Sequence, residues 1–215
     1  MLRPLHASVL VWLLAVLLFI PLQLWAVDEG IDYSTLKTAQ PTETGDQVEV
    51  LEVFWYSCPH CWHLEPTMQS WVATMPAGAA FRRLPGADGR LEPHARAYYA
   101  AESMGKLDVL HPALFKAIHG DKRTLWTEDA LVEFAGQIGL DEQEFRAAFN
   151  SFAVDTKVRK AQDMSRRYGI DGVPAVIING KYRTSPSQAG DQDRFIEVMN
   201  TLVTRELAAK SAPAQ

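Results

Sequence analysis

The chain has 215 residues, of which 47% are hydrophobic and 22% are charged, and this composition predicts an ordinary folded protein with one domain or one domain carrying an insertion. Its formal net charge is −5. Nucleic-acid-binding proteins usually carry a basic patch and a high isoelectric point, so the charge argues against nucleic acid as a partner.

Residues 1–26 differ in composition from the rest of the chain. A short start that contains Arg3 is followed by an apolar run interrupted by Ser8 and Gln23, which is the pattern of an export signal. Leu24 stands where a cleavage site usually has a small residue, so both a signal peptide and an uncleaved N-terminal membrane anchor fit, and a buried core helix is the third interpretation. Export predicts an oxidising compartment, in which disulfides persist.

The next part of the chain, residues 27–87, predicts a strand, a helix and a second strand. Residues 27–46 are polar and predict an arm or a first edge strand, whereas residues 48–56 are β-branched and aromatic, as in a strand covered on both faces. A helix is expected from Pro59 to about Met75, because proline suits the first helical position. Pro66 is expected to kink it, and residues 80–85 predict another strand.

A block of helices follows. Several segments place apolar residues three and four positions apart, and glycine ends most of them. These segments are residues 92–105, 108–120, 127–139, 141–151 and 154–169. Thr127 and Asp141 are plausible N-caps. We expect residues 88–150 to form an all-helical insertion.

Strand character returns after the helical block. Residues 173–183 predict a hairpin whose turn is at Asn179 and Gly180, and residues 191–210 predict a last amphipathic helix before a flexible tail at 211–215. The order of elements predicts an α/β fold in which residues 27–87 and 151–210 build one mixed sheet with helices on it, interrupted by the helical insertion.

Both cysteines of the chain, Cys58 and Cys61, lie where the first long strand gives way to a helix. Unpaired N–H groups and the helix dipole favour an anion at a helix N-terminus. The thiolate of Cys58 can accept hydrogen bonds from the amides of His60 and Cys61, and a protonated His60 would add positive charge, so the pKa of Cys58 should be low. A low pKa makes Cys58 a good leaving group and stabilises the reduced form, so the disulfide would be readily given away.

Two other interpretations of the cysteine pair are weaker. A zinc site would have to combine Cys58 and Cys61 with His60 and His63 from a single stretch of helix, since the chain has no further cysteine. An inert structural disulfide would close a very small loop and would restrain the unfolded chain little. The sequence therefore favours a redox function.

These residues also carry a family resemblance. The motif "CPHC" at 58–61 after "LEVFWYS", together with "GVPAVIINGKYR" at 172–183, resembles the periplasmic thiol:disulfide oxidoreductases of the DsbA family. The resemblance extends from Asp32 through the helical block to the last helix. It implies a thioredoxin fold with an inserted helical domain.

The resemblance also implies roles for the motif residues. Cys58 would be the exposed attacking position and Cys61 the buried resolving thiol, with the Pro59–His60 dipeptide between them and His60 tuning the couple. The peptide bond between Val173 and Pro174 would be cis and face the disulfide, so that the Val173 backbone can pair with an extended substrate.

Glu52 and Trp62 are further candidates near the cysteines. By the resemblance, Glu52 corresponds to a buried glutamate of the family that handles the proton of the resolving thiol. The alternatives are a carboxylate at the strand edge and a structural ion pair with Arg82 or Arg83. The family often has lysine near this glutamate, and arginine does not exchange protons in proteins, so the relay partner is open. Trp62 could line an apolar substrate groove or belong to the core.

Three histidines of the helical block, at positions 94, 111 and 119, lack ligand spacing and are expected to be ordinary surface or core residues.

By this resemblance the protein donates the Cys58–Cys61 disulfide to reduced, newly exported proteins in the periplasm. It would be reoxidised by an inner-membrane, quinone-linked partner of the DsbB type, would need no metal or small cofactor, and would be a monomer. The rival interpretations are a membrane-tethered reductase or isomerase that uses the same thiols, and a peptide-binding holdase.

Overall fold

The computed structural model describes residues 27–211. The expected signal peptide or anchor at 1–26 lies outside the described residues, as does the expected tail from residue 212 onward, whereas Ser211 is the last residue of the final helix. Among residues 27–211, no helix is both long enough and apolar enough to cross a membrane.

The strands of the described chain form one five-stranded sheet in the order β1-β5-β4-β2-β3. Their bounds are Ser34–Thr35 for β1, Val48–Phe54 for β2, Ala79–Pro85 for β3, Ala175–Ile178 for β4 and Tyr182–Thr184 for β5. Strands β2 and β3 are parallel, and the other neighbours are antiparallel. Every residue of β2 is buried, as its continuous apolar pattern predicted. The strand ends two residues earlier than expected, because Trp55 begins a turn in which the Cys58 N–H donates to its carbonyl oxygen.

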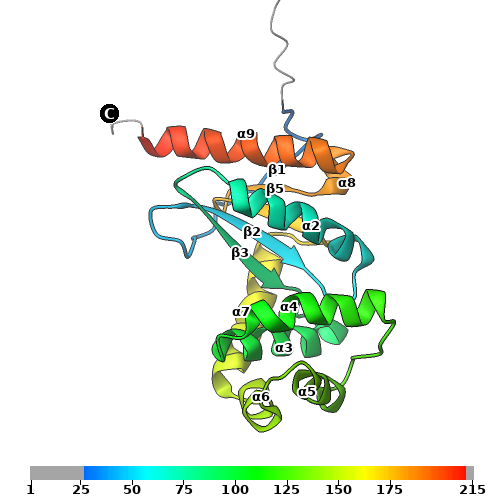
Figure 1. Ribbon diagram of the computed structural model, residues 1–215. Coiled ribbons are helices and arrows are strands. Elements are labelled where there is room, and N and C mark those ends of the chain that lie inside the picture. The colour runs from blue at the N-terminus through cyan, green and yellow to red at the C-terminus, as the bar shows by residue number, and fades with distance from the viewer. Residues whose placement is uncertain (1–26, 212–215) are drawn as a thin grey trace, which may run out of the picture.

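Helices α2 (Pro59–Thr74) and α9 (Gln192–Ser211) cover one face of this sheet (Figure 1). Val50 and Ile178 point to this face and pack with Met68 of α2 and Leu202 of α9 in one apolar cluster. Helix α2 continues through Pro66 for two further turns. Pro59 and His60 at its start are exposed, whereas Cys61, Leu64 and Met68 on its inner face are buried.

The helices between β3 and β4 lie on the other side of the sheet (Figure 1), where Leu51 and Ile177 join their apolar cluster. They are α3 (Glu92–Ser103), α4 (Leu107–Phe115), α5 (Glu128–Gln137), α6 (Glu142–Phe149) and α7 (Phe152–Arg167), with a 3-10 turn at Gly89–Leu91 and a π-helical turn at Lys116–Gly120. A short helix, α8 (Pro186–Ala189), precedes α9. The side chains of Thr127 and Asp141 accept hydrogen bonds from backbone N–H groups three residues on, so both predicted N-caps are confirmed.

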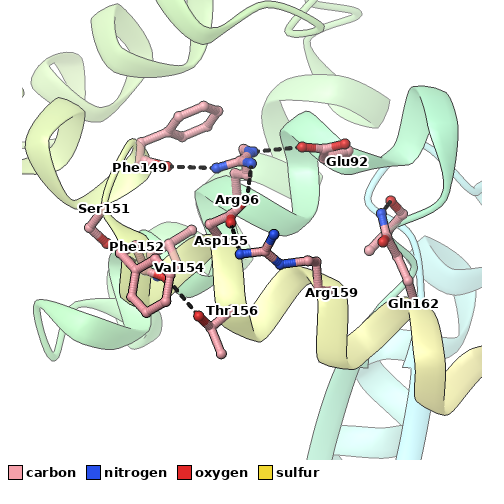
Figure 2. Close-up of polar contacts among 11 residues, drawn as sticks. Glu92, Arg96, Phe149, Ser151, Phe152, Val154, Asp155, Thr156, Arg159 and Gln162 are labelled. Carbon is pink, nitrogen blue, oxygen red and sulfur yellow. Dashed lines mark hydrogen bonds and ion pairs between the residues drawn. The ribbon is translucent and has the colours of Figure 1, made fainter.

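Helix α7 connects the helical layer with the sheet. Figure 2 shows the guanidinium of Arg96, from α3, between Glu92 and Asp155, with a further hydrogen bond to the carbonyl oxygen of Phe149. Two turns later, the Gln162 amide donates to the carbonyl oxygen of Ala87 at 3.0 Å. Helix α7 therefore contacts the expected insertion at Arg96 and the expected first part of the sheet-building domain at Ala87, and the expected boundaries at residues 88 and 150 stay predictions.

The predicted hairpin turn is confirmed at Asn179 and Gly180, which both have positive φ angles, 49° and 64°. Gly180 is needed for its positive φ and also because a Cβ atom at this position would collide with the carbonyl oxygen of Gln40. The N–H of Gln40 in turn donates to the carbonyl oxygen of Gly180. The turn therefore holds the polar segment at residues 27–46 against the end of the hairpin through Gln40.

Candidate active site

Cys58 is the N-cap residue of α2, and Cys61 lies one turn further along the helix. Both are free thiols. Cys61 is completely buried, as expected, but Cys58 is only 7% exposed, so the expectation of an exposed Cys58 is too strong. The reason is that Cys58 lies against the loop before β4, where its Sγ atom donates a hydrogen bond to the Val173 carbonyl oxygen at 3.3 Å.

The pKa of Cys58 is lowered from 9.0 to about 6. The largest contribution is a hydrogen bond from the Cys61 thiol; burial opposes it, and the backbone N–H groups of Cys61 and His60 and the charge of His60 lower the pKa further. The sequence predicted the amides and His60, but it did not predict that the partner thiol contributes most. Cys58 is therefore largely a thiolate at neutral pH.

The pKa of Cys61 moves in the opposite direction. The hydrogen bond that Cys61 gives to Cys58, its burial, and the negative charges of Cys58 and Glu52 all raise it far above its ordinary value. The two thiols of one motif are thus an acidic thiol at the helix terminus and a protonated thiol beneath it. Because only Cys58 is stabilised as a thiolate, the two cysteines have different roles in disulfide exchange and cannot replace one another.

The peptide bond between Val173 and Pro174 is cis, as the family resemblance implied. A cavity of about 630 Å³ opens beside it. Val173 and Pro174 form one wall, and His60 and His63 of α2, both exposed, form another. Within residues 27–211, no three His, Cys, Asp or Glu side chains are grouped closely enough to hold a metal ion.

Glu52 lies in β2 beneath the cysteines and is buried. Its Oε2 atom is 3.0 Å from Nε of Arg83, which stands directly opposite it in β3, while Arg82 pairs with Glu49 and Glu43 instead. Burial raises the pKa of Glu52 to about 7, although the Arg83 charge acts against this. A carboxyl group that titrates near neutral pH can both accept and donate a proton.

A second carboxylate shares Arg83. The Nη2 atom of Arg83 is 2.8 Å from Oε1 of Glu65 in α2, and Nε2 of His111 in α4 is 3.4 Å from the same oxygen. Burial raises the pKa of Glu65, but His111 and Arg83 lower it by more, so its net pKa is low. Glu65 therefore stays ionised, and its charge is one of the causes that raise the pKa of Glu52.

Trp62 does not line the cavity beside Val173. Its ring stacks on His119 of the π-helical turn, with centroids 5.9 Å apart and planes 11° from parallel, and it packs against Phe115. Nε2 of His119 is 2.7 Å from the carbonyl oxygen of Tyr56. The helical layer therefore contacts the cysteine motif directly.

Sequence reasoning missed Glu65, His111 and His119 as parts of the site. One signal was available for Glu65, because it follows Cys61 by four residues and so shares its helix face. Both histidines have hydrogen-bond partners, as expected of ordinary surface or core residues, but nothing in their spacing indicated that those partners belong to the cysteine site.

Known proteins resemble this chain over most of its length. A family model described as a DSBA-like thioredoxin domain matches residues 81–197. The thiol:disulfide interchange protein DsbA of Burkholderia cepacia is 38% identical over 177 residues, which are 81% of this chain and 83% of that protein. DsbA of Azotobacter vinelandii is 36% identical and covers 84% of this chain and 85% of its own.

Solved structures agree with these relatives. The crystal structure of Pseudomonas aeruginosa DsbA superposes with a TM-score of 0.81 at 34% identity, covering 85% of this chain and 96% of its own. The Xylella fastidiosa oxidoreductase DsbA gives 0.79 at 30% identity, with 84% and 98% covered. With its paired thiols at the start of α2 and this fold, the chain belongs to the DsbA-like thioredoxin domain family and is a thiol:disulfide oxidoreductase.

Proposed function

We propose that the Cys58–Cys61 disulfide is the group that this protein donates to reduced proteins. The observation that carries the proposal is the opposite pKa shift of the two thiols, with Cys58 lowered to about 6 and Cys61 raised. A stabilised Cys58 thiolate favours the reduced form of the couple over the disulfide, because only the reduced form contains the thiolate. Such a couple passes its disulfide to other thiols.

The exchange takes two steps. A substrate thiolate attacks Sγ of Cys58 in the disulfide, the Cys58–Cys61 bond breaks, and Cys61 leaves as a thiolate. The second substrate thiolate then attacks the substrate sulfur of the mixed disulfide, and Cys58 leaves as the stabilised thiolate. The substrate loses two electrons and gains a disulfide, and the enzyme gains both electrons as two reduced cysteines.

Glu52 is the proposed proton donor to Cys61 in the first step. Cys58 is bonded to the substrate at this stage, but burial still raises the pKa of Cys61 and favours protonation of its thiolate as it leaves. Glu52, with a pKa near 7, is partly protonated at neutral pH and can supply the proton. Arg83 remains charged and holds the Glu52 carboxyl group in place at 3.0 Å. When the Cys58–Cys61 disulfide is formed again, Cys61 must lose its proton, and Glu52 accepts it.

The cavity beside Val173 and Pro174 is the proposed site for the substrate backbone. The Val173 carbonyl oxygen accepts a hydrogen bond from Cys58 only when that thiol is protonated. In the disulfide form Cys58 has no S–H, so the same oxygen is available to a substrate N–H. Binding through main-chain hydrogen bonds tolerates many substrate sequences. The predicted contact of Trp62 with substrate stays a prediction.

The proposed substrates are reduced, unfolded proteins that have been exported to the periplasm, since the apolar segment at 1–26 has the pattern of an export signal. A membrane-bound, quinone-linked partner of the DsbB type would restore the disulfide after each cycle, and the protein would act as a monomer. The relatives' description as thiol:disulfide interchange proteins supports the exchange chemistry.

The test uses the oxidised protein and a reduced, unfolded model protein with two thiols. The wild type should form one substrate disulfide per equivalent. Neither Cys61→Ser nor Cys58→Ser can form the Cys58–Cys61 disulfide, so both should leave the substrate thiols reduced. Equilibration with glutathione then gives the reduction potential. A couple that stays oxidised in a reducing glutathione buffer would show a reductase instead, and binding without thiol loss would show a holdase.

A further inference from the structure

Tyr56, two residues before Cys58, is held at three points by one segment of the helical layer. Its hydroxyl oxygen is 2.8 Å from Nδ1 of His111, its ring centroid is 4.9 Å from that of Phe115, and its carbonyl oxygen is 2.7 Å from Nε2 of His119. The first two contacts fix the side chain, and only the third reaches the backbone.

These three residues share one face because of the π-helical turn. His111 and Phe115 are four residues apart in α4 and therefore neighbours on its surface. In a continuous α-helix His119 would drift away from that face, but the Lys116–Gly120 turn is π-helical and holds more residues per turn. The wider turn returns the His119 ring to the line of the other two.

His119 bridges the two ends of the cysteine motif. The Tyr56 carbonyl group lies within the turn from Trp55 to Cys58, and Trp62, on which His119 stacks, directly follows Cys61. A carbonyl oxygen can only accept, so His119 is the donor and its proton is on Nε2. The contact to Tyr56 is therefore a directed hydrogen bond, whereas the contact to Trp62 is ring packing.

We propose that His119 is a positioning residue, which fixes Cys58 at the N-terminus of α2 by holding the Tyr56 carbonyl group. Without a donor this part-buried carbonyl group would have to turn toward water, and only Ser57 separates its peptide group from Cys58. A displaced Sγ atom would lose alignment with the Cys61 thiol and with the His60 and Cys61 amides. The acidity of Cys58 thus depends on a side chain of the helical layer.

Two substitutions separate the hydrogen bond from the stacking. The glutamine side chain in His119→Gln retains an N–H donor at a similar reach but loses the ring, and His119→Phe retains a ring against Trp62 but loses the donor. We expect the Cys58 pKa to stay near the wild-type value in His119→Gln. In His119→Phe it should rise by about half a unit to one unit, which is roughly a three- to tenfold loss in the acid dissociation constant.

A matched control is His94→Phe. His94 is a buried histidine of the helical layer, and its Nε2 lies 2.7 Å from the carbonyl oxygen of Leu125, outside the cysteine turn. Its ring also contacts the rings of Trp55 and Tyr56, and phenylalanine keeps a ring at this position while it removes the hydrogen bond to Leu125. His94→Phe should therefore lower the unfolding free energy and leave the Cys58 pKa unchanged. Thiolate absorbance against pH gives the pKa of each reduced variant, and denaturant unfolding gives its stability.

The opposite order, with His119→Phe near the wild type and His119→Gln shifted, would overturn the proposal and leave only ring packing. Equal shifts in His119→Phe and His94→Phe would also overturn it, because the effect would then follow general loosening of the helical layer. The inference concerns the proposed reactive thiol, but it is independent of the direction of exchange. If the wild-type protein does not oxidise the model substrate, the proposed oxidase function is wrong, but the expected differences in Cys58 pKa among the variants are unaffected.

Discussion

The Sγ atom of Cys58 lies 3.3 Å from the carbonyl oxygen of Val173, although 115 positions separate the two residues in the chain. Strand pairing brings them together. Val53, near the end of β2, stands opposite Ala175 at the start of the antiparallel strand β4, so the residues just beyond these two strand ends meet at the same end of the sheet. The reactive thiol and the proposed substrate-binding backbone are therefore fixed by the same sheet register.

Replacing Cys61 tests the origin of the low Cys58 pKa. Because the hydrogen bond from the Cys61 thiol is its largest cause, Cys61→Ala should raise the Cys58 pKa from about 6 toward 9.0, and by more than His60→Ala does. Cys61→Ser keeps a donor and should give an intermediate value. The rate of alkylation of Cys58 against pH measures each pKa. A larger effect of His60→Ala would show that the histidine charge dominates.

Glu52→Gln should change how stability depends on pH. A pKa raised in the folded state means that the native protein binds the proton more tightly than the unfolded chain, so the stabilisation is complete below the ordinary value of 4.5 and is lost as pH rises through about 7. The wild type should thus lose about 2–3 kcal/mol between pH 4.5 and pH 8 from this group. Glutamine is neutral throughout, so denaturant unfolding of the variant should lack this component. If the unfolding free energies of the wild type and of Glu52→Gln change with pH in parallel, this prediction is wrong.

Glu65→Gln should lower the pKa of Glu52. It removes a negative charge that raises this pKa, and it leaves Arg83 to Glu52 alone. We expect a fall of about one unit, read from the carboxyl carbon chemical shift of Glu52 during titration. The control is Glu49→Gln, another buried carboxylate of β2, which pairs with Arg82 instead. A shift of the same size in the control would mean that Glu52 responds to net charge and not to its sharing of Arg83.

Arg96→Ala should weaken the attachment of α7 to α3. The Arg96 guanidinium contacts Glu92, Asp155 and the Phe149 carbonyl oxygen and is mostly buried, so its loss should cost about 1–2 kcal/mol of unfolding free energy. Arg159 pairs with the same aspartate but is largely exposed, and Arg159→Ala should cost less than about 0.5 kcal/mol. Urea unfolding with an unchanged m-value measures both. Equal costs would show that burial of Arg96 adds nothing.

Several features of the site were predictable from local sequence. The position of Cys58 at a helix N-terminus follows from the mostly apolar strand shortly before it and from Pro59 directly after it, and the hairpin follows from Asn179 and Gly180. These predictions hold because each depends on residues that are neighbours in the chain. The cis bond before Pro174 was not local information; it came from the family resemblance.

Which arginine joins Glu52 was decided only by the tertiary structure. Arg82 and Arg83 are adjacent in β3 and point to opposite faces of the sheet, so a shift of one residue in the pairing of β2 with β3 would exchange them. The sequence by itself determined which residues carry the chemistry, namely two cysteines at the start of a helix and an acid in the strand before them. Partners such as Arg83 and His119 were decided by strand register and by helix packing. These contacts join segments that are far apart in the chain, and the local sequence does not show that they are close in space.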